Sequence, residues 1–466
     1  MKKLLNWIIP AVFGIGLWMI PTPEGLTPQS WHLFAIFVAT IVGFITQPLP
    51  IGGVSIVVIT VAALTGTLKI GEAISGFANS AIWLIVGAFL FSRGFIKTGL
   101  GKRIAYNLIA AFGSSSLRLA YALALSDLIL APATPSNTAR VGGVIMPITT
   151  SLAKAFGSEP QDGPRKIGSF LMQSIYQVNT ITSAMFQTSM AGNTLVAALA
   201  LQSFGIGITW GDWAMAAIVP GIVALLIMPY FIYKVYPPEI RDAREAQQMI
   251  REELRGLGKM SFQEWVMLGV FVLALVLWAT SQFTKLDATT VAFLGISILL
   301  ATSVLVWDDV KSEKGAWDTL VWMGTLMGFA GFLSKLGFIK WATVLVGGYI
   351  PEGSWIIAFV IAVLINTYSH YVFASLTAHI SAMFVAFSAI AISAGAPPML
   401  TLLMIAFTSN LCMSLTHYAA GPSPVIFNTG YVPQNTWWKL GFFASVINLI
   451  IFMGLGSVWM KAIGMW

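Results

Sequence analysis

The chain has 466 residues, of which 57% are hydrophobic and 9% are charged, and its formal net charge is +7. No soluble domain of this size could bury so much apolar surface. The composition therefore predicts an all-α polytopic membrane protein that is embedded in the lipid bilayer. An excess of Lys and Arg in such a protein mostly marks cytoplasmic loops, so the charge gives no reason to expect a nucleic-acid partner.

Apolar runs long enough to cross a bilayer, about 20 residues each, recur along the whole chain. We predict about eleven transmembrane helices and two broken stretches, near 112–153 and 355–395, that form re-entrant hairpins. With this topology most basic residues fall inside and the N-terminus is cytoplasmic. The predicted spans lie near 5–21, 30–48, 54–68, 78–97, 166–200, 210–236, 265–283, 287–306, 318–334, 398–430 and 437–463.

The most polar segment, 237–264, divides the chain into two halves, 1–236 and 265–466. We expect this segment to be a cytoplasmic linker that forms a short solvated helix with near-neighbour ion pairs. The second half begins in the opposite orientation to the first, as in the inverted repeats of secondary transporters. The N-terminus carries no cleavage signal, so we expect an uncleaved first helix and a prokaryotic cell (inner) membrane.

A small polar motif occurs once in each half, inside strongly apolar sequence. Each copy has two hydroxyl residues followed by a cation, and the copies lie 239 residues apart. The copies are Ser136-Asn137-Thr138 with Arg140, and Ser375-Leu376-Thr377 with His379. Such residues often serve only hydrogen bonding between membrane helices, but two copies at one fixed offset favour a binding site.

The first copy of the motif follows a break in the helical pattern. Pro132 and Pro135 cannot sit inside a continuous helix, and each disfavours helical conformation in the residue before it. Ser136 then restarts a helix as its N-cap. Freed N–H groups and the positive end of the new helix favour a carboxylate, so the two copies predict an anion-binding site.

Two further breaks are expected opposite the hairpins, at Gly192-Asn193-Thr194 and at Gly421-Pro422-Ser423-Pro424. Unwound backbone at membrane depth is tolerated where it is buried or lines a cavity. The alternative is simple kinking for packing. We therefore add to the substrate-binding residues Asn193, Thr194, Gly421, Pro422 and Ser423.

The cations of the motif have two interpretations each. An ionised Arg140 at mid-membrane is costly and therefore usually functional, but it can also form a fixed structural ion pair with Asp127. His379 alone could be a neutral packing residue, and its equivalence to Arg140 favours a function. His370 and His417 have no equivalent and are taken as bystanders or supporting groups.

Patterns typical of enzymes and metal sites are missing from the sequence. It contains no phosphate-binding Gly-x-x-x-x-Gly-Lys loop, and its four histidines lack the spacing of a metal site, so we predict neither metal nor cofactor. An intramembrane enzyme would need a nucleophile–base pair, for which Ser375 and His379 are the candidate, with no acid to orient the histidine. An anion channel would need a continuous polar pore, whereas the polar residues cluster at one depth.

The stretch from Pro135 to Gly143, with the sequence Pro-Ser-Asn-Thr-Ala-Arg-Val-Gly-Gly, resembles the divalent anion/sodium symporter superfamily. The stretch from Leu415 to Pro424 and that from Thr182 to Phe186 are similar to its exchanger branch of bacterial citrate/succinate antiporters and plastid 2-oxoglutarate/malate translocators. The resemblance covers essentially the whole chain. It implies a homodimer with scaffold and elevator-type transport domains, and a di- or tricarboxylate bound between the hairpin tips.

The chain departs from the sodium-binding pattern that the resemblance implies for coupled members. Leu376 replaces the second asparagine, and Pro132 and Tyr371 occupy two earlier hydroxyl positions. We expect Arg140 and His379 to supply a fixed charge in place of sodium. This predicts sodium-independent exchange of 2-oxoglutarate, malate, succinate or fumarate. The alternatives are a sodium-coupled di/tricarboxylate symporter that uses backbone carbonyls, and a citrate/succinate antiporter.

Overall fold

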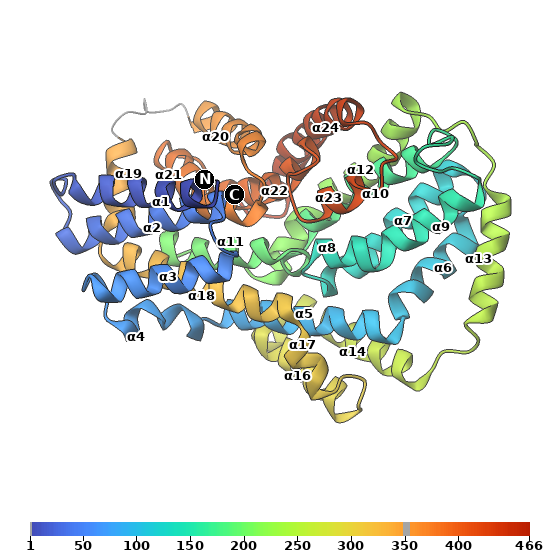
Figure 1. Ribbon diagram of the computed structural model, residues 1–466, viewed down its shortest axis with the longest axis horizontal. Helices are drawn as coiled ribbons and strands as arrows, with labels where there is room; N and C mark the ends of the chain where they lie inside the picture. The colour runs from blue at the N-terminus through green and yellow to red at the C-terminus, as the bar shows by residue number, and fades with distance from the viewer. Residues whose placement is uncertain (1, 348–354) are drawn as a thin grey trace.

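The computed structural model of the chain describes residues 2–347 and 355–466. Helices make up almost all of this part, which contains no strand and one isolated backbone bridge, between Ser115 and Asp242. Residue 1 and residues 348–354, which belong to the predicted halves, lie outside the described residues. Figure 1 shows α1–α4 at one end of the molecule and α6 and α13 at the other.

The helices follow one another with short connections. The first half contains α1 (Lys2–Met19), α2 (Pro28–Thr46), α3 (Ile51–Leu64), α4 (Ile70–Ala73), η1 (Ser75–Ala78), α5 (Ser80–Thr98), α6 (Leu100–Phe112), α7 (Ser116–Leu130), η2 (Ala131–Ala133), α8 (Asn137–Arg140), η3 (Val141–Ile145), α9 (Met146–Ala155), α10 (Gly168–Met185), η4 (Gln187–Ser189), α11 (Ala191–Phe204) and α12 (Trp210–Val235). The linker holds α13 (Arg244–Gly256). The second half contains α14 (Phe262–Ala279), α15 (Ser281–Thr284), α16 (Ala288–Ala301), α17 (Trp307–Ser312), α18 (Lys314–Lys335), α19 (Phe338–Gly347), α20 (Trp355–Ser369), η5 (His370–Val372), α21 (Leu376–Ser393), α22 (Pro398–Leu411), η6 (Cys412–Leu415), α23 (Pro422–Phe427), α24 (Gln434–Leu449), η7 (Ile450–Gly456) and α25 (Ser457–Ala462).

Nine helices in the described part of the chain are long and apolar enough to cross a membrane, and three shorter apolar helices accompany them. Both predicted hairpins are pairs of helices with a break between them, α7 to α9 and α20 to α21. The predicted spans 166–200 and 398–430 are each interrupted, at 186–190 and at 412–421. Each interruption leaves backbone groups without their helical partners.

Helix α10 lies at the centre of the packing. All 18 of its residues are buried, and it contacts α7, α12 and α22. Its sequence is rich in polar side chains, including Gln173, Gln177 and Asn179, which are completely buried. The Asn179 amide donates to Asp127, whereas the side-chain polar atoms of Gln173 and Gln177 have no hydrogen-bond partner in the described part of the chain.

Helix α13 of the linker packs against the protein along one face. Its residues Ala246, Gln247 and Ile250 are buried against α6. Gln247 and Arg251 donate hydrogen bonds to the carbonyl oxygen of Ala110 in α6, at 2.9 Å for Gln247 Nε2. The predicted linker helix is therefore present, but it is docked along one side rather than solvated all round.

The ion pairs of the linker also differ from the expected near-neighbour pairs within its helix. Arg244 pairs with Asp242, just before the helix. Glu264 pairs with Arg103 of α6, with 2.5 Å between Oε1 and Nε, and both residues are buried. Arg103 also donates to the carbonyl oxygen of Gly258 at 2.9 Å. One buried charge pair thus fastens the end of the linker to the first half.

We predict that Glu264→Gln lowers the midpoint of thermal unfolding in detergent by several degrees, because it leaves Arg103 buried without its countercharge. Asp308→Asn is the matched control, since it removes the same charge from an exposed ion pair with Lys311. The Asp308 side chain is 84% exposed and that of Lys311 is 60% exposed. Exposed pairs of this kind contribute little to stability. Scanning fluorimetry measures both variants, and equal small shifts would contradict the role assigned to Arg103 and Glu264.

Candidate functional site

Both copies of the polar motif restart helices after a break, which the sequence predicted for the first copy. The hydroxyl of Ser136 accepts a hydrogen bond from the Ala139 amide at 3.1 Å, at the start of α8. The hydroxyl of Ser375 accepts one from the Ala378 amide at 3.3 Å, at the start of α21. Serine is a preferred N-cap because its side chain satisfies an amide that the first turn leaves free. The remaining amides and the positive helix ends stay available to an anion.

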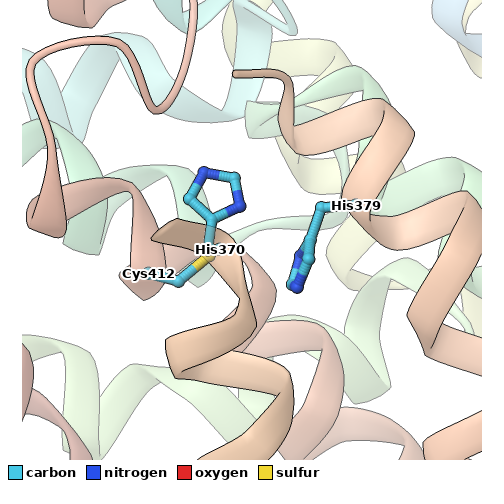
Figure 2. Close-up of side chains that lie close together, drawn as sticks. All are labelled: His370, His379 and Cys412. Atoms are coloured by element: carbon cyan, nitrogen blue, oxygen red, sulfur yellow. The ribbon is translucent and has the colours of Figure 1, made fainter. Parts of the chain in front are cut away.

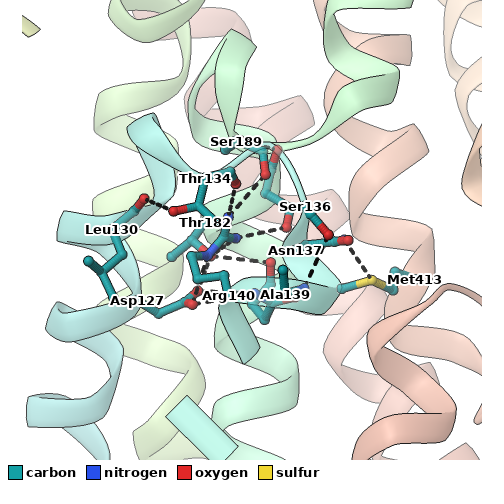
Figure 3. A network of polar contacts seen from close by, with 12 residues as sticks. Asp127, Leu130, Thr134, Ser136, Asn137, Ala139, Arg140, Thr182, Ser189 and Met413 are labelled. Carbon is teal, nitrogen blue, oxygen red and sulfur yellow. Dashed lines mark hydrogen bonds and ion pairs between the residues drawn. The ribbon is translucent and has the colours of Figure 1, made fainter. Parts of the chain in front are cut away.

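Arg140 is completely buried and forms an ion pair with Asp127, with 2.9 Å between Nε and Oδ1 (Figure 3). Its Nη2 donates to the hydroxyls of Thr182 and Ser183, at 3.3 and 3.2 Å. Asp127 accepts further hydrogen bonds from Asn179 and from Thr182. The sequence left two interpretations open for Arg140, and the structure contains the one in which Arg140 forms an ion pair with Asp127. The positive charge is balanced by Asp127, so Arg140 adds no net charge here.

The same guanidinium also binds two backbone carbonyls of the broken helices. Its Nη1 lies 2.8 Å from the carbonyl oxygen of Thr134, in the hairpin break, and 3.0 Å from that of Ser189, in the break between α10 and α11 (Figure 3). Unwound carbonyls at membrane depth must find internal partners. Arg140 therefore joins the first hairpin to the neighbouring break with one fixed cation.

The second hairpin repeats only part of this arrangement, because the hydrogen bonds of His379 stay within the hairpin and involve no carboxylate. His379 Nε2 lies 2.8 Å from the carbonyl oxygen of Asn366 and 3.1 Å from the hydroxyl of Ser369. Asn366 follows Asp127 by 239 residues, the same offset that separates His379 from Arg140. The Asn366 side chain donates to the hydroxyl of Ser409 at 3.1 Å. The same two positions of each half are thus in contact, as a structural repeat predicts, although Arg140 meets the Asp127 side chain and His379 the Asn366 backbone.

The first break lies earlier than the sequence indicated. Helix α10 ends at Met185, whereas Asn193 and Thr194 belong to the first turn of α11. Asn193 Nδ2 donates to the carbonyl oxygens of Ser183 and Phe186, at 2.7 and 2.9 Å. Thr194 donates to the Gln187 carbonyl at 3.3 Å. Asn193 and Thr194 are buried, and their hydrogen bonds stabilise the break. The prediction placed the break too late in the chain, because helix starts favour the same small and polar residues that we took for the break itself.

The second break is displaced in the same way. It covers 412–421, and Pro422 begins α23, where proline is favoured. The hydroxyl of Ser423 accepts a hydrogen bond from the Ala420 amide at 3.1 Å and lies 2.8 Å from the hydroxyl of Tyr176. Pro422 and Ser423 are buried. Through these hydrogen bonds, Ser423 links the break to α10.

The tip of the first hairpin touches the second break across the two halves. Asn137 is buried, and its Nδ2 lies 3.6 Å from the sulfur of Met413. Gly421 lies against Thr138, so close that a Cβ atom added at Gly421 would stand 2.1 Å from Oγ1. Only glycine permits this approach. The tip of the first hairpin is thus set by the second half of the chain.

The ten predicted substrate-binding residues divide into two groups by exposure. Ser136, Thr138, Ser375 and Thr377 are half-buried and Gly421 is exposed, so these five can meet a solute. Asn137, Asn193, Thr194, Pro422 and Ser423 are buried behind them. The sequence did not point to Tyr176 or Ser189 as supporting residues, and it pointed to Ser183 only within the stretch from Thr182 to Phe186. The run of polar side chains along α10 was the signal that could have found Tyr176 and Ser183.

A cavity of about 870 Å³ opens beside the first break. Gln187 and Thr194 line it, together with Trp210, Lys285 and Asp287 from the neighbouring helices. The four hydroxyl residues of the motif are not among its lining residues. The cavity therefore reaches the broken segment without touching the hydroxyl residues of the hairpin tips.

We predict that Gly421→Ala strongly reduces transport by pushing Thr138 and the first hairpin tip away from the second break. The double variant Gly421→Ala/Thr138→Ala should recover part of the activity, because it removes the hydroxyl and methyl groups that clash. Transport in vesicles and the thermal midpoint are measured together. Unchanged transport in Gly421→Ala would mean that the tip and the break do not need this contact.

We predict that Arg140→Met and Asp127→Leu each destabilise the protein by about 3–5 kcal/mol, because each leaves one buried charge without its partner. The double variant should be more stable than either single one, since no unpaired charge remains. A double-mutant cycle on thermal midpoints measures this coupling. Additive losses would contradict the ion pair.

A family model described as the sodium:sulfate symporter transmembrane region matches residues 1–466. The chain is 51% identical over 465 residues to the putative malate transporter YflS of Bacillus subtilis (strain 168), and the match covers 100% of this chain and 97% of that protein. It is 46% identical over 470 residues to the chloroplastic dicarboxylate transporter 1 of Spinacia oleracea, and that match covers 100% of this chain and 82% of that protein. The crystal structure of the YdaH transporter of Alcanivorax borkumensis matches 99% of this chain and 97% of that one, with a TM-score of 0.54 and 11% identity, which indicates a common fold. The chain therefore belongs to the sodium:sulfate symporter family of divalent anion/sodium symporters, whose members are multi-pass membrane transporters and not enzymes.

Proposed function

We propose that the chain exchanges dicarboxylates such as 2-oxoglutarate, malate, succinate and fumarate across a prokaryotic cell membrane without sodium. The named activities of the malate and dicarboxylate relatives support the substrate class. Two helix N-termini, capped by Ser136 and Ser375, offer amides and positive dipole ends to two carboxylates. The half-buried hydroxyls of Thr138 and Thr377 are suitable further donors.

The observation that carries the sodium independence is the position of the Arg140 guanidinium. It donates hydrogen bonds to the carbonyl oxygens of Thr134 and Ser189, which belong to the two broken segments. Hard cations such as sodium bind oxygen ligands of this kind, and here a permanent cation already satisfies them. Because Asp127 balances the charge, the site needs no dissociable ion to assemble. At the second hairpin, the Leu376 side chain offers no oxygen ligand, and His379 takes the equivalent position as a neutral ring, without the fixed charge that we expected of it.

Exchange follows from the state of the empty site. Without substrate, the two positive helix ends face an unfilled polar site, and no sodium accompanies them in either state. A dicarboxylate compensates both ends. We infer that the loaded form crosses the membrane easily and the empty form slowly, which makes uptake depend on a counter-substrate.

The mobile unit in this proposal contains both hairpins together with the two breaks. The hydrogen bonds of Arg140, the contact of Thr138 with Gly421 and the hydrogen bond of His370 to the Ala419 carbonyl tie these four elements into one body. We propose that this body moves as an elevator against a scaffold formed by the remaining helices, in a homodimer whose N-termini are cytoplasmic.

The test uses proteoliposomes preloaded with succinate and supplied with labelled 2-oxoglutarate, with and without a sodium gradient. We expect uptake to require internal dicarboxylate and to ignore sodium. Uptake into empty vesicles that a sodium gradient drives would favour the sodium-coupled symporter instead.

We predict that Ser375→Ala lowers this exchange roughly tenfold, since an N-cap and a substrate contact together are worth about 1–2 kcal/mol. Ser297→Ala is the matched control, because Ser297 is an exposed serine of α16 that bonds only within its own helix. Equal rates in both variants would contradict a role for the second helix N-terminus in binding.

A further inference from the structure

Three side chains that metal ions favour meet behind the second hairpin. His370 of η5, His379 of α21 and Cys412 of η6 are all completely buried (Figure 2). One ligand atom from each residue lies within 4.8 Å of the others. The sequence spacing gave no sign of this cluster, because the break after α22 brings Cys412 to the hairpin from a separate segment.

The hydrogen bonds of the two histidines fix which nitrogen is free. His370 Nε2 lies 2.9 Å from the carbonyl oxygen of Ala419, and His379 Nε2 lies 2.8 Å from that of Asn366. A carbonyl oxygen only accepts, so each Nε2 carries the proton and each Nδ1 keeps a lone pair. Both Nδ1 atoms are buried and have no hydrogen-bond partner in the described part of the chain. Histidines that ligate metals usually have this arrangement, with the second nitrogen donating to a carbonyl.

The rings also pack edge to face, with centroids 4.8 Å apart. Packing alone accounts for the contact between them, but it leaves two buried lone pairs without a donor, which costs free energy. Figure 2 shows the two rings beside Cys412, the single cysteine of the chain. The ligand set is therefore two neutral imidazoles and one thiol.

The charge of the surroundings selects the kind of ion. Residues 355–466 contain no Asp or Glu, so the cluster has no carboxylate of its own segment to balance an added charge. A thiolate and two imidazoles neutralise a monovalent cation fully, whereas a divalent cation would leave a buried net charge. Thiolate ligands are soft and favour Cu(I).

We propose that His370, His379 and Cys412 form a binding site for a soft monovalent cation of the Cu(I) class. The thiol loses one proton for each ion that enters, so the pocket stays neutral. Bond lengths of about 2.0–2.3 Å place three ligand atoms roughly 3.6 Å apart around an ion. Closing the observed 4.8 Å to this value moves each ligand atom by less than about 1 Å.

The bound ion would join three segments of the second half. His370 and His379 lie on either side of the hairpin break, and Cys412 begins the break after α22. An ion here would fasten the hairpin tip to the break, as Arg140 fastens the corresponding segments of the first half. Binding should therefore raise the stability of the folded protein.

The experiment titrates the purified protein with Cu(I) under anaerobic, reducing conditions, in competition with a chromophoric Cu(I) chelator. We expect one tightly bound ion per chain and an ultraviolet thiolate-to-metal charge-transfer band, which only Cys412 can produce. Cys412→Ser should lose the band and weaken binding by at least about 100-fold. His370→Gln should weaken it as well.

His417→Gln is the matched control, because the ring of His417 bonds to Trp438 and is outside the cluster. It should bind Cu(I) like the unchanged chain. Cu(I) should also raise the thermal midpoint of the unchanged chain but not that of Cys412→Ser. A folded chain that binds no Cu(I), or equal binding in Cys412→Ser, would overturn the proposal.

Discussion

The structure depends on how an interrupted helix is tolerated inside a membrane. Every carbonyl that leaves a helix there needs an internal partner, because the bilayer supplies none. In the first half one buried guanidinium meets this need. Arg140 donates hydrogen bonds to the carbonyls of Thr134 and Ser189 at the same time. Asp127 offsets the cost of burying Arg140 by balancing its charge. The shape of the first hairpin, and with it the position of Ser136, follows from that pair.

The second half solves the same problem with neutral groups. Asn366 stands where the first half has Asp127, and His379 stands where it has Arg140. A histidine makes fewer hydrogen bonds than a guanidinium, and one nitrogen on each of His370 and His379 is left unpaired. The second hairpin is therefore less completely tied than the first. The difference between the halves explains both the absence of a dissociable ion in the proposed mechanism and the presence of a soft ligand cluster behind the second tip.

The sequence predicted the helical membrane fold, the helix break before Ser136 and the N-cap at that residue, because proline positions and capping residues act locally. It misplaced the other two breaks, since small and polar residues such as Asn193 and Ser423 mark the first turn of a helix as often as an interruption. It named Asp127 as a partner of Arg140 but could not decide between this ion pair and a role in binding, which depends on how two arms of a hairpin face each other. Contacts between the halves, such as that of Thr138 with Gly421, have no local signal at all.

The central claim is that fixed groups at the hairpins take the place of sodium. The most direct test measures the dissociation constant of 2-oxoglutarate by calorimetry on the purified protein, as sodium replaces choline at constant ionic strength. The account predicts a dissociation constant that does not change with sodium. A dissociation constant that falls steadily as sodium rises would show that the ion binds with the substrate, and it would contradict the role given to Arg140 and His379.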